Sequence, residues 1–423
     1  MRTGRPGGSR RDGEYEPGGA KGALLKLTIE EPGPYRFALS HLGFRPFFLL
    51  AGLYAVLVVG LWTWLYQFDM AALPTAAFGG PFAWHGHTLI FGYAMAVVAG
   101  FLLTAVRNWT GVQTTHGPAL LVLAGLWLGG RVAALFGDPG LVAMALFDLG
   151  FTLWLLAALA RPVWQTRQWA QLAVIGKIAL LGASNGLFYL GAFDLLDGGQ
   201  RLGLYSGVYL VLSLILMMGR RVIPFFIERG LDGAFTPVNR DWLDRLALVL
   251  LLAFWLVEVF LPWAPVAAGL AAGLAVAHGM RWTGWHTPAL WRKPLLWVLM
   301  MAYGWIVIGF ALRAVAEFTP LSPMAALHAF TYGGIGMMTL GMMTRVALGH
   351  TGRNVFDPPR VLGLLFGLLA IGALVRVAGP LLWPALTASW MSASQLLWIA
   401  AFAGFLWVYA PMLVKPRIDG RYG

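Results

Sequence analysis

Long apolar stretches, separated by short polar segments rich in glycine and proline, follow one another from residue 45 to residue 414. Nearly all are about 18 residues or longer, which as a helix is enough to cross a hydrocarbon core of roughly 30 Å. Typical breakers stand at 78–81, 137–140 and 197–199. The pattern therefore predicts an all-α transmembrane bundle of about twelve helices, or of eleven if the short stretch 264–280 is re-entrant. The expected spans are 45–67, 84–106, 117–136, 140–160, 170–192, 201–219, 242–262, 264–280, 293–315, 323–347, 360–378 and 390–414.

Composition supports a lipid environment. Of the 423 residues, 59% are hydrophobic and only 11% are charged, whereas soluble domains carry about 25% charged residues. The chain has no cysteine, which excludes thiolate metal sites, cysteine-ligated iron–sulfur clusters and covalently attached haem. Any haem would have to be held non-covalently, through histidine or methionine.

The charges sort by side of the predicted membrane. The formal net charge is +12, and most of the 30 Lys and Arg residues fall in segments that an even number of spans places on one side. The positive-inside rule then puts both termini in the cytoplasm of a bacterial inner-membrane protein, and the charge needs no nucleic acid to explain it. We expect a flexible basic tail over 1–40, without a cleavable signal peptide, a membrane domain over 41–414 and a short tail over 415–423.

Three of the eight histidines are predicted to lie in the outer leaflet, at a similar depth: His85, His87 and His328. Imidazole is the commonest metal ligand and an axial ligand of haem, so a metal or haem site is one interpretation. The alternative is that these histidines bond backbone carbonyls or water at helix starts. Positions i and i+2 point roughly 200° apart on a helix, so His85 and His87 are expected to serve different partners unless Gly86 bends the chain.

An internal repeat links the second and tenth spans. The segments 87–111 and 328–352 align without a gap, and Met217–Arg220 in the sixth span resembles Met342–Arg345 in the tenth. Spans two, six and ten would then be equivalent, and the chain would form three four-helix units. A porphyrin held between His87 and His328 would fit such an arrangement. The identical pairs in the alignment are His87/His328, Gly92/Gly333, Gly100/Gly341, Thr110/Thr351 and Gly111/Gly352.

Four segments resemble the NnrS family: HLGFRPFF at 41–48, the stretch 84–111, GRRVIPFF at 219–226 and the stretch 328–353. The resemblance implies a bacterial inner-membrane protein that contains haem and copper and acts in nitric oxide metabolism and resistance to nitrosative stress. The architecture also resembles the catalytic subunit of haem–copper oxidases and nitric oxide reductases, which holds a low-spin haem between spans two and ten. Spans six and seven here lack the histidines that bind the second metal in that subunit, so its binuclear site and its reductase chemistry are not expected to carry over.

Three arginines near outer helix ends, Arg131, Arg313 and Arg376, are candidates to bind haem propionates, because a guanidinium binds carboxylates bidentately. Each could instead snorkel to lipid headgroups, and Arg313 could pair with Glu317 one turn away. Four further polar side chains within spans, which could relay protons or hold the bundle in register, are Asp148, Lys177, Asn185 and Glu258.

Three functions are open at this point. The first is a protein with haem b, and possibly copper, that binds nitric oxide or passes it electrons from an unknown donor; whether it is an enzyme, a nitric oxide oxidoreductase, stays open. The second is a twelve-span secondary transporter, although such proteins usually show six-plus-six repeats. The third is a non-catalytic scaffold or maturation factor for a partner metalloenzyme.

Overall fold

The computed structural model describes residues 37–72, 78–261 and 263–423, and these residues form helices and no strand. Most of the predicted tail, residues 1–36, lies outside the described residues. Proline opens many of the helices, where its missing N–H costs nothing. The helices are α1 Phe44–Gln67, α2 Pro81–His87, η3 Thr88–Ala94, α3 Met95–Thr110, α4 Gly117–Ala133, α5 Asp138–Gln165, α6 Leu172–Ala192, α7 Gly199–Gly230, α8 Asp241–Phe260, α9 Ala264–Trp285, α10 Pro294–Ala316, α11 Pro323–His328, η7 Ala329–Gly336, α12 Met337–His350, α13 Leu362–Leu382 and α14 Thr387–Val414.

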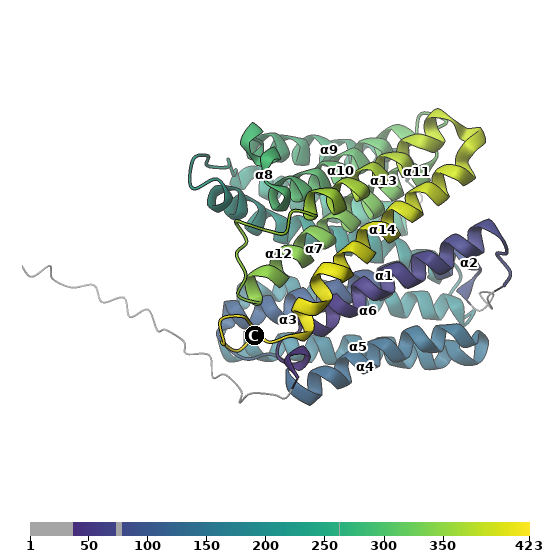
Figure 1. Cartoon of the computed structure of the whole chain (residues 1–423). Helices are drawn as coiled ribbons and strands as arrows, with labels where there is room; N and C mark the ends of the chain where they lie inside the picture. Colours follow the sequence, from purple (N-terminus) through teal and green to yellow (C-terminus); the bar gives the residue numbers. More distant parts are fainter. Residues whose placement is uncertain (1–36, 73–77, 262) are drawn as a thin grey trace, which may run out of the picture.

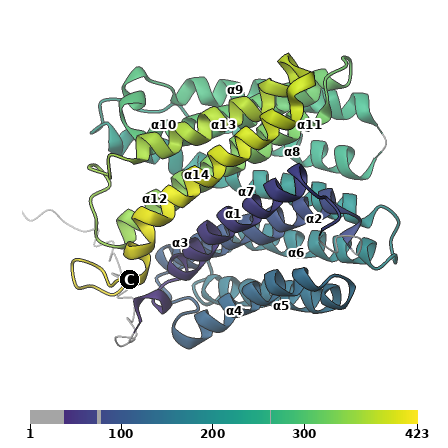
Figure 2. The same ribbon diagram turned by 45° about the vertical axis from the view of Figure 1, so that its right-hand side comes forward.

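A helix or a continuous helical segment covers each of the twelve expected spans. Within the described residues, nine helices are long and apolar enough to cross a membrane. The other three expected spans are α8, α9 and the continuous segment α11–η7–α12, which pack among the nine (Figures 1 and 2). The stretch around 264–280 is not re-entrant, because α9 runs unbroken over Ala264–Trp285 between α8 and α10.

The helices group in fours. The first group is α13, α14, α1 and the segment α2–η3–α3; the second is α4, α5, α6 and α7; the third is α8, α9, α10 and the segment α11–η7–α12. Within each group, consecutive helices pack against each other along the chain, with α14 packing on α1 to close the first group. The prediction of three four-helix units is confirmed.

Each group ends in one of the three equivalent spans, and these three meet at the centre. Tyr93 of η3 shares a hydrogen bond of 2.6 Å with Thr339 of α12. Gly207 of α7 lies so close to η3 that an added methyl group would touch Ile90. The ring of Tyr209, also on α7, lies 6.1 Å from the ring of Phe330 in η7. Spans two, six and ten are therefore in mutual contact.

The repeated sequence has a structural counterpart at both of its ends. In spans two and ten the backbone changes from α- to π-helix directly after the aligned histidine, into η3 and η7. π-helical turns inside α-helices occur frequently at functional sites. At the other end, Thr110 and Thr351 each donate to the carbonyl four residues earlier at 2.7 Å, and Gly111 and Gly352 have φ of 68° and 79°. The Thr-Gly pair is thus a helix stop that uses the left-handed region.

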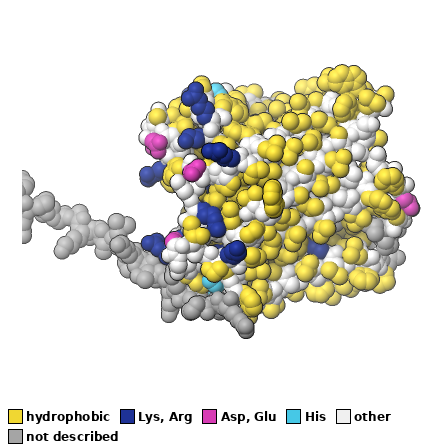
Figure 3. All heavy atoms as spheres, viewed as in Figure 1, with side chains coloured by type: hydrophobic (Ala, Val, Ile, Leu, Met, Phe, Trp, Pro, Cys, Tyr) yellow, Lys and Arg dark blue, Asp and Glu magenta, His cyan; other side chains and the backbone are white. Residues whose placement is uncertain are grey.

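Lys and Arg gather at one end of the bundle, next to the C-terminus, while the middle of the visible surface is apolar (Figure 3). We call this the basic end and the opposite one the outer end. The distribution agrees with the positive-inside prediction, and the assignment of the basic end to the cytoplasm stays a prediction.

Arg45, in the motif HLGFRPFF, connects two helices at the basic end. Its side chain is fully buried, and its guanidinium donates to the carbonyls of Met412, Leu413 and Lys415 at 2.7–3.2 Å. The first two carbonyls belong to the last turn of α14 and the third to its C-cap residue, where no intrahelical donor remains. Arg45 therefore joins the first span to the end of the last.

We expect Arg45→Ala to lower the free energy of unfolding by about 3 kcal/mol, because it leaves buried carbonyls without a donor. The measurement is thermal or denaturant unfolding in detergent. Arg360→Ala, which removes an exposed arginine at the same end, is the control and should change little. Equal stability of Arg45→Ala and the parent would show that the carbonyl contacts contribute nothing.

Candidate functional site

His85 and His87 face different helices. The ring of His85 stacks on Trp62 of α1, with centroids 4.3 Å apart, and it lies within electrostatic range of His328 and Arg376. His87 points toward α6, where its Nε2 lies 2.8 Å from Oδ1 of Asn185. The two histidines thus have separate partners, and His85 is the one on the side of His328.

The hydrogen bonds of His328 define its tautomer. Nδ1 lies 2.8 Å from the carbonyl oxygen of Met324, an acceptor, so Nδ1 carries the proton. Nε2 is then the nitrogen with the lone pair, and the guanidinium of Arg376 donates to it at 2.9 Å. A backbone carbonyl on one nitrogen, with the other left as an acceptor, is the usual arrangement of a ligating histidine.

Of the three candidate arginines, Arg376 is the one without an ion pair among the described residues. It is only 8% exposed, and no carboxylate among the described residues lies within ion-pair distance of it. Its Nε has no hydrogen-bond partner. A buried, uncompensated cation is costly, so this position favours an anionic group.

The other two candidate arginines already have carboxylates. Arg131 forms a buried ion pair with Asp148. Arg313 donates to both oxygens of Glu258, at 2.8 and 2.7 Å, and also lies 3.7 Å from Glu317. Of the three, only Arg376 is left free for an anionic ligand.

We define the outer site as Trp62, His85, His328, Tyr332 and Arg376. Tyr332 belongs to it because it lies within electrostatic range of Arg376 and donates to the carbonyl of residue 394 on α14 at 2.7 Å. The site is built from α1, α2, α11–η7 and α13, and it lies where the first and third helix groups meet.

Buried polar atoms without hydrogen-bond partners concentrate at this end of the bundle. Two belong to the outer site besides Arg376: Nε1 of Trp62 and Nδ1 of His85. One turn apart on α14, Ser392, Gln395 and Trp398 leave further polar atoms unpaired, and the Trp398 ring lies 5.0 Å from that of Tyr332. Buried polar groups are normally paired, so such a concentration is typical of a site that accepts a ligand or water.

His87 belongs to a second, buried polar cluster, in which span two meets α4, α5 and α6 of the second helix group. Asp148 accepts from the hydroxyl of Tyr189 at 2.7 Å and pairs with Arg131. Asn185 is 3.5 Å from the same carboxylate and 2.8 Å from His87. The ring of His87 otherwise lies against aromatic rings, and its Nδ1 has no partner.

The described residues contain no group of three or more His, Cys, Asp or Glu side chains placed to hold a metal ion. Such a group is not needed by haem, which takes one or two axial residues. The sequence pointed to His85, His87, His328 and the arginines but missed Trp62 and Gln395. The spacing of Ser392, Gln395 and Trp398, one turn apart, was the available signal for an inward polar stripe on α14.

The NnrS family model, described as NnrS protein, matches residues 38–417, nearly the whole described chain. The chain belongs to the NnrS family. A comparison with curated proteins gave no match. The matched range contains every residue of the outer site and of the His87 cluster, so both are part of the NnrS domain.

We expect Asp148→Asn to lower the free energy of unfolding by about 3–5 kcal/mol, because Arg131 would be left as an unpaired buried charge. The double variant Arg131→Gln with Asp148→Asn should recover much of the loss. The control Glu317→Gln removes the secondary carboxylate from an arginine that keeps Glu258, and it should cost less than about 0.5 kcal/mol. A mild Asp148→Asn variant would contradict the ion-pair assignment.

Proposed function

We propose that this NnrS protein binds haem b at the outer site and acts there on nitric oxide, by binding it or by passing it electrons, as part of the response to nitrosative stress. The observation that carries the proposal is the pairing of His328 with an uncompensated, buried Arg376. Imidazole and guanidinium are the two side chains that a non-covalent haem needs most, the first for iron and the second for the carboxylates.

The residues of the outer site fit such a group. His328 has its lone pair on Nε2, and Arg376 now occupies the position in front of it at 2.9 Å. A bound carboxylate would draw the guanidinium away and expose that lone pair. His85 supplies a second imidazole within electrostatic range, with Nδ1 unpaired. The haem, when bound, would supply an iron centre that takes nitric oxide or an electron.

The chain itself would orient and shield this group. Trp62 fixes the ring plane of His85 by stacking at an interplanar angle of 16°. The carbonyl of Met324 holds the tautomer of His328. The unpaired donors of Trp62 and Gln395 would serve polar edges of the ligand or bound water.

The geometry favours His85 over His87 as the partner of His328. His87 already contacts Asn185 and belongs to the Asp148 cluster, on the other side of span two. A copper site is supported less well than haem, because copper usually takes three nitrogen or sulfur ligands and the described residues offer no such group. The three four-helix groups also differ from the six-plus-six repeats usual in transporters.

We expect the purified protein to show a b-type Soret band that His328→Ala and His85→Ala abolish. His87→Ala should keep the band, because it alters the Asp148 cluster and leaves the outer site intact. His286→Ala, at the basic end, is the matched control. A pigment-free but folded parent protein, or loss of haem in His87→Ala with retention in His85→Ala, would contradict this assignment.

Arg376→Ala should weaken haem binding roughly tenfold, the effect of losing about one charge-assisted hydrogen bond. Titration of the apoprotein with haem measures it, and Arg376→Lys, which keeps the charge, should lose less. Unchanged affinity in Arg376→Ala would remove the carboxylate role.

A further inference from the structure

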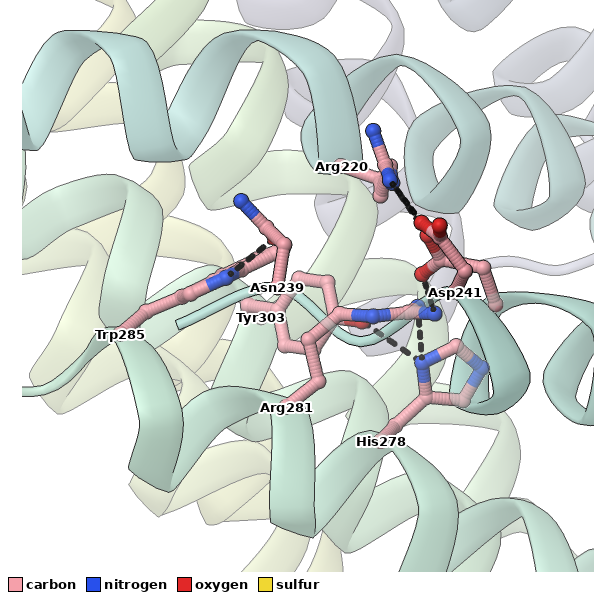
Figure 4. Close-up of polar contacts among 8 residues, drawn as sticks. Arg220, Asn239, Asp241, His278, Arg281, Trp285 and Tyr303 are labelled. Atoms are coloured by element: carbon pink, nitrogen blue, oxygen red, sulfur yellow. Dashed lines mark hydrogen bonds and ion pairs between the residues drawn. The ribbon is translucent and has the colours of Figure 1, made fainter. Parts of the chain in front are cut away.

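Two polar clusters at the basic end differ in how their arginines are paired. One joins α7, α8 and α9, where the carboxylate of Asp244 accepts from Arg220 at 2.5 Å and from Arg281 at 2.7 Å (Figure 4). Both arginines have a carboxylate, so this cluster holds helices together. The other cluster lies where the segment between α3 and α4 meets the end of α5. Its arginine is Arg161, and no carboxylate among the described residues lies within ion-pair distance of it.

This other cluster lines a cavity of about 480 Å³, which we call the α4–α5 cavity. Its volume is within the range of roughly 300–1,000 Å³ that is typical of ligand sites. One wall is the segment 112–116 together with Ala119 in the first turn of α4. The other wall is one face of α5, whose residues follow one another at helical spacing: Trp154, Ala157, Ala158, Arg161 and Gln165.

The α5 wall is apolar in its deeper part and polar toward the basic end. α5 runs to the basic end, where Gln168, just after it, donates to the carbonyl of Trp109 in α3 at 2.7 Å. Trp154 and Ala157 come earlier on this face, and Arg161 lies one turn closer to the basic end. All three side chains are exposed. The cavity therefore opens on the lipid-facing surface, with its polar part at the depth expected for headgroups.

The polar part of the cavity offers donors without acceptors. The N-cap residue of α4, His116, makes no side-chain cap hydrogen bond, so no side chain covers the positive end of this helix dipole. Arg107 donates to Oε1 of Gln113 at 2.5 Å, which makes the other end of that amide its NH2 group. This Nε2 is buried and has no hydrogen-bond partner. Together with the guanidinium of Arg161, these groups favour an anion with several oxygens.

We propose that the α4–α5 cavity binds one anionic phospholipid, with the phosphate at Arg161 and Gln113 and an acyl chain along Trp154 and Ala157. The phosphate oxygens supply the acceptors that the donors lack. A free anion would use the polar part of the cavity alone, whereas the exposed apolar part matches the hydrocarbon that a lipid carries. Basic pockets between transmembrane helices bind such headgroups in other membrane proteins.

The experiment is native mass spectrometry of the delipidated full-length protein, titrated with phosphatidylglycerol or with phosphatidylcholine, whose choline offsets the phosphate charge. The parent should bind one phosphatidylglycerol about tenfold more tightly than phosphatidylcholine, the effect of about one charge-assisted hydrogen bond. Arg161→Gln should lose this preference. Arg292→Gln removes an exposed arginine between α9 and α10 and is the matched control. Equal binding of the two lipids by the parent, or a preference that survives Arg161→Gln, would overturn the proposal.

A second variant tests the apolar part of the cavity. Ala157→Leu keeps Arg161 but fills the space for the acyl chain, and it should weaken phosphatidylglycerol binding about tenfold. Ala157 is exposed, so the larger side chain leaves the core undisturbed, and Ala272→Leu at an exposed alanine of α9 is the control. Excess inorganic phosphate should leave the lipid bound. Displacement by phosphate, or unchanged binding in Ala157→Leu, would overturn the lipid assignment. The measurement needs no haem, so its result is independent of the proposed function.

Discussion

The arrangement of this protein depends on one constraint, which is that a charge inside a bilayer must find its partner within the protein. Lipid offers no hydrogen bonds, so a buried guanidinium needs either acceptors from the protein, such as carboxylates or the carbonyls around Arg45, or a bound group that supplies them. Arg131 and Arg313 satisfy the first condition, through Asp148 and Glu258. Arg376 satisfies the second, since a neutral histidine is its only side-chain hydrogen-bond partner among the described residues. Arg131 and Arg313 therefore hold helices of the bundle together, whereas Arg376 marks the candidate ligand site.

The same constraint applies to the ring nitrogens of the histidines. His328 and His87 each hold one ring nitrogen in a defined hydrogen bond, to the carbonyl of Met324 and to Asn185. At the other nitrogen, His328 leaves its lone pair to Arg376, and His87 leaves Nδ1 unpaired. The arrangement at His328 suits a metal or haem ligand, because the nitrogen that faces Arg376 carries a lone pair.

The π-helical turns connect the repeat to the site. In spans two and ten the irregular backbone begins directly after His87 and His328, and it changes the direction of the residues that follow. Tyr332, inside the second of these turns, thereby reaches α14, and Tyr93, inside the first, reaches Thr339. In each of these two spans, the irregular backbone thus places an aromatic hydroxyl against another helix group.

The sequence by itself determined the class of fold, the approximate number of spans and their grouping, because apolar length and turn residues are local properties and the repeat spans whole helices. It also singled out His85, His87, His328 and Arg376. Only the tertiary structure decided that His85, and not His87, lies near His328, that Arg131 and Arg313 are neutralised, and that Trp62 and Gln395 join the same region. The physical reason is that pairing depends on how helices are rotated and packed against one another. That rotation is set by many weak contacts between segments far apart in the chain, which hydropathy along the sequence does not record.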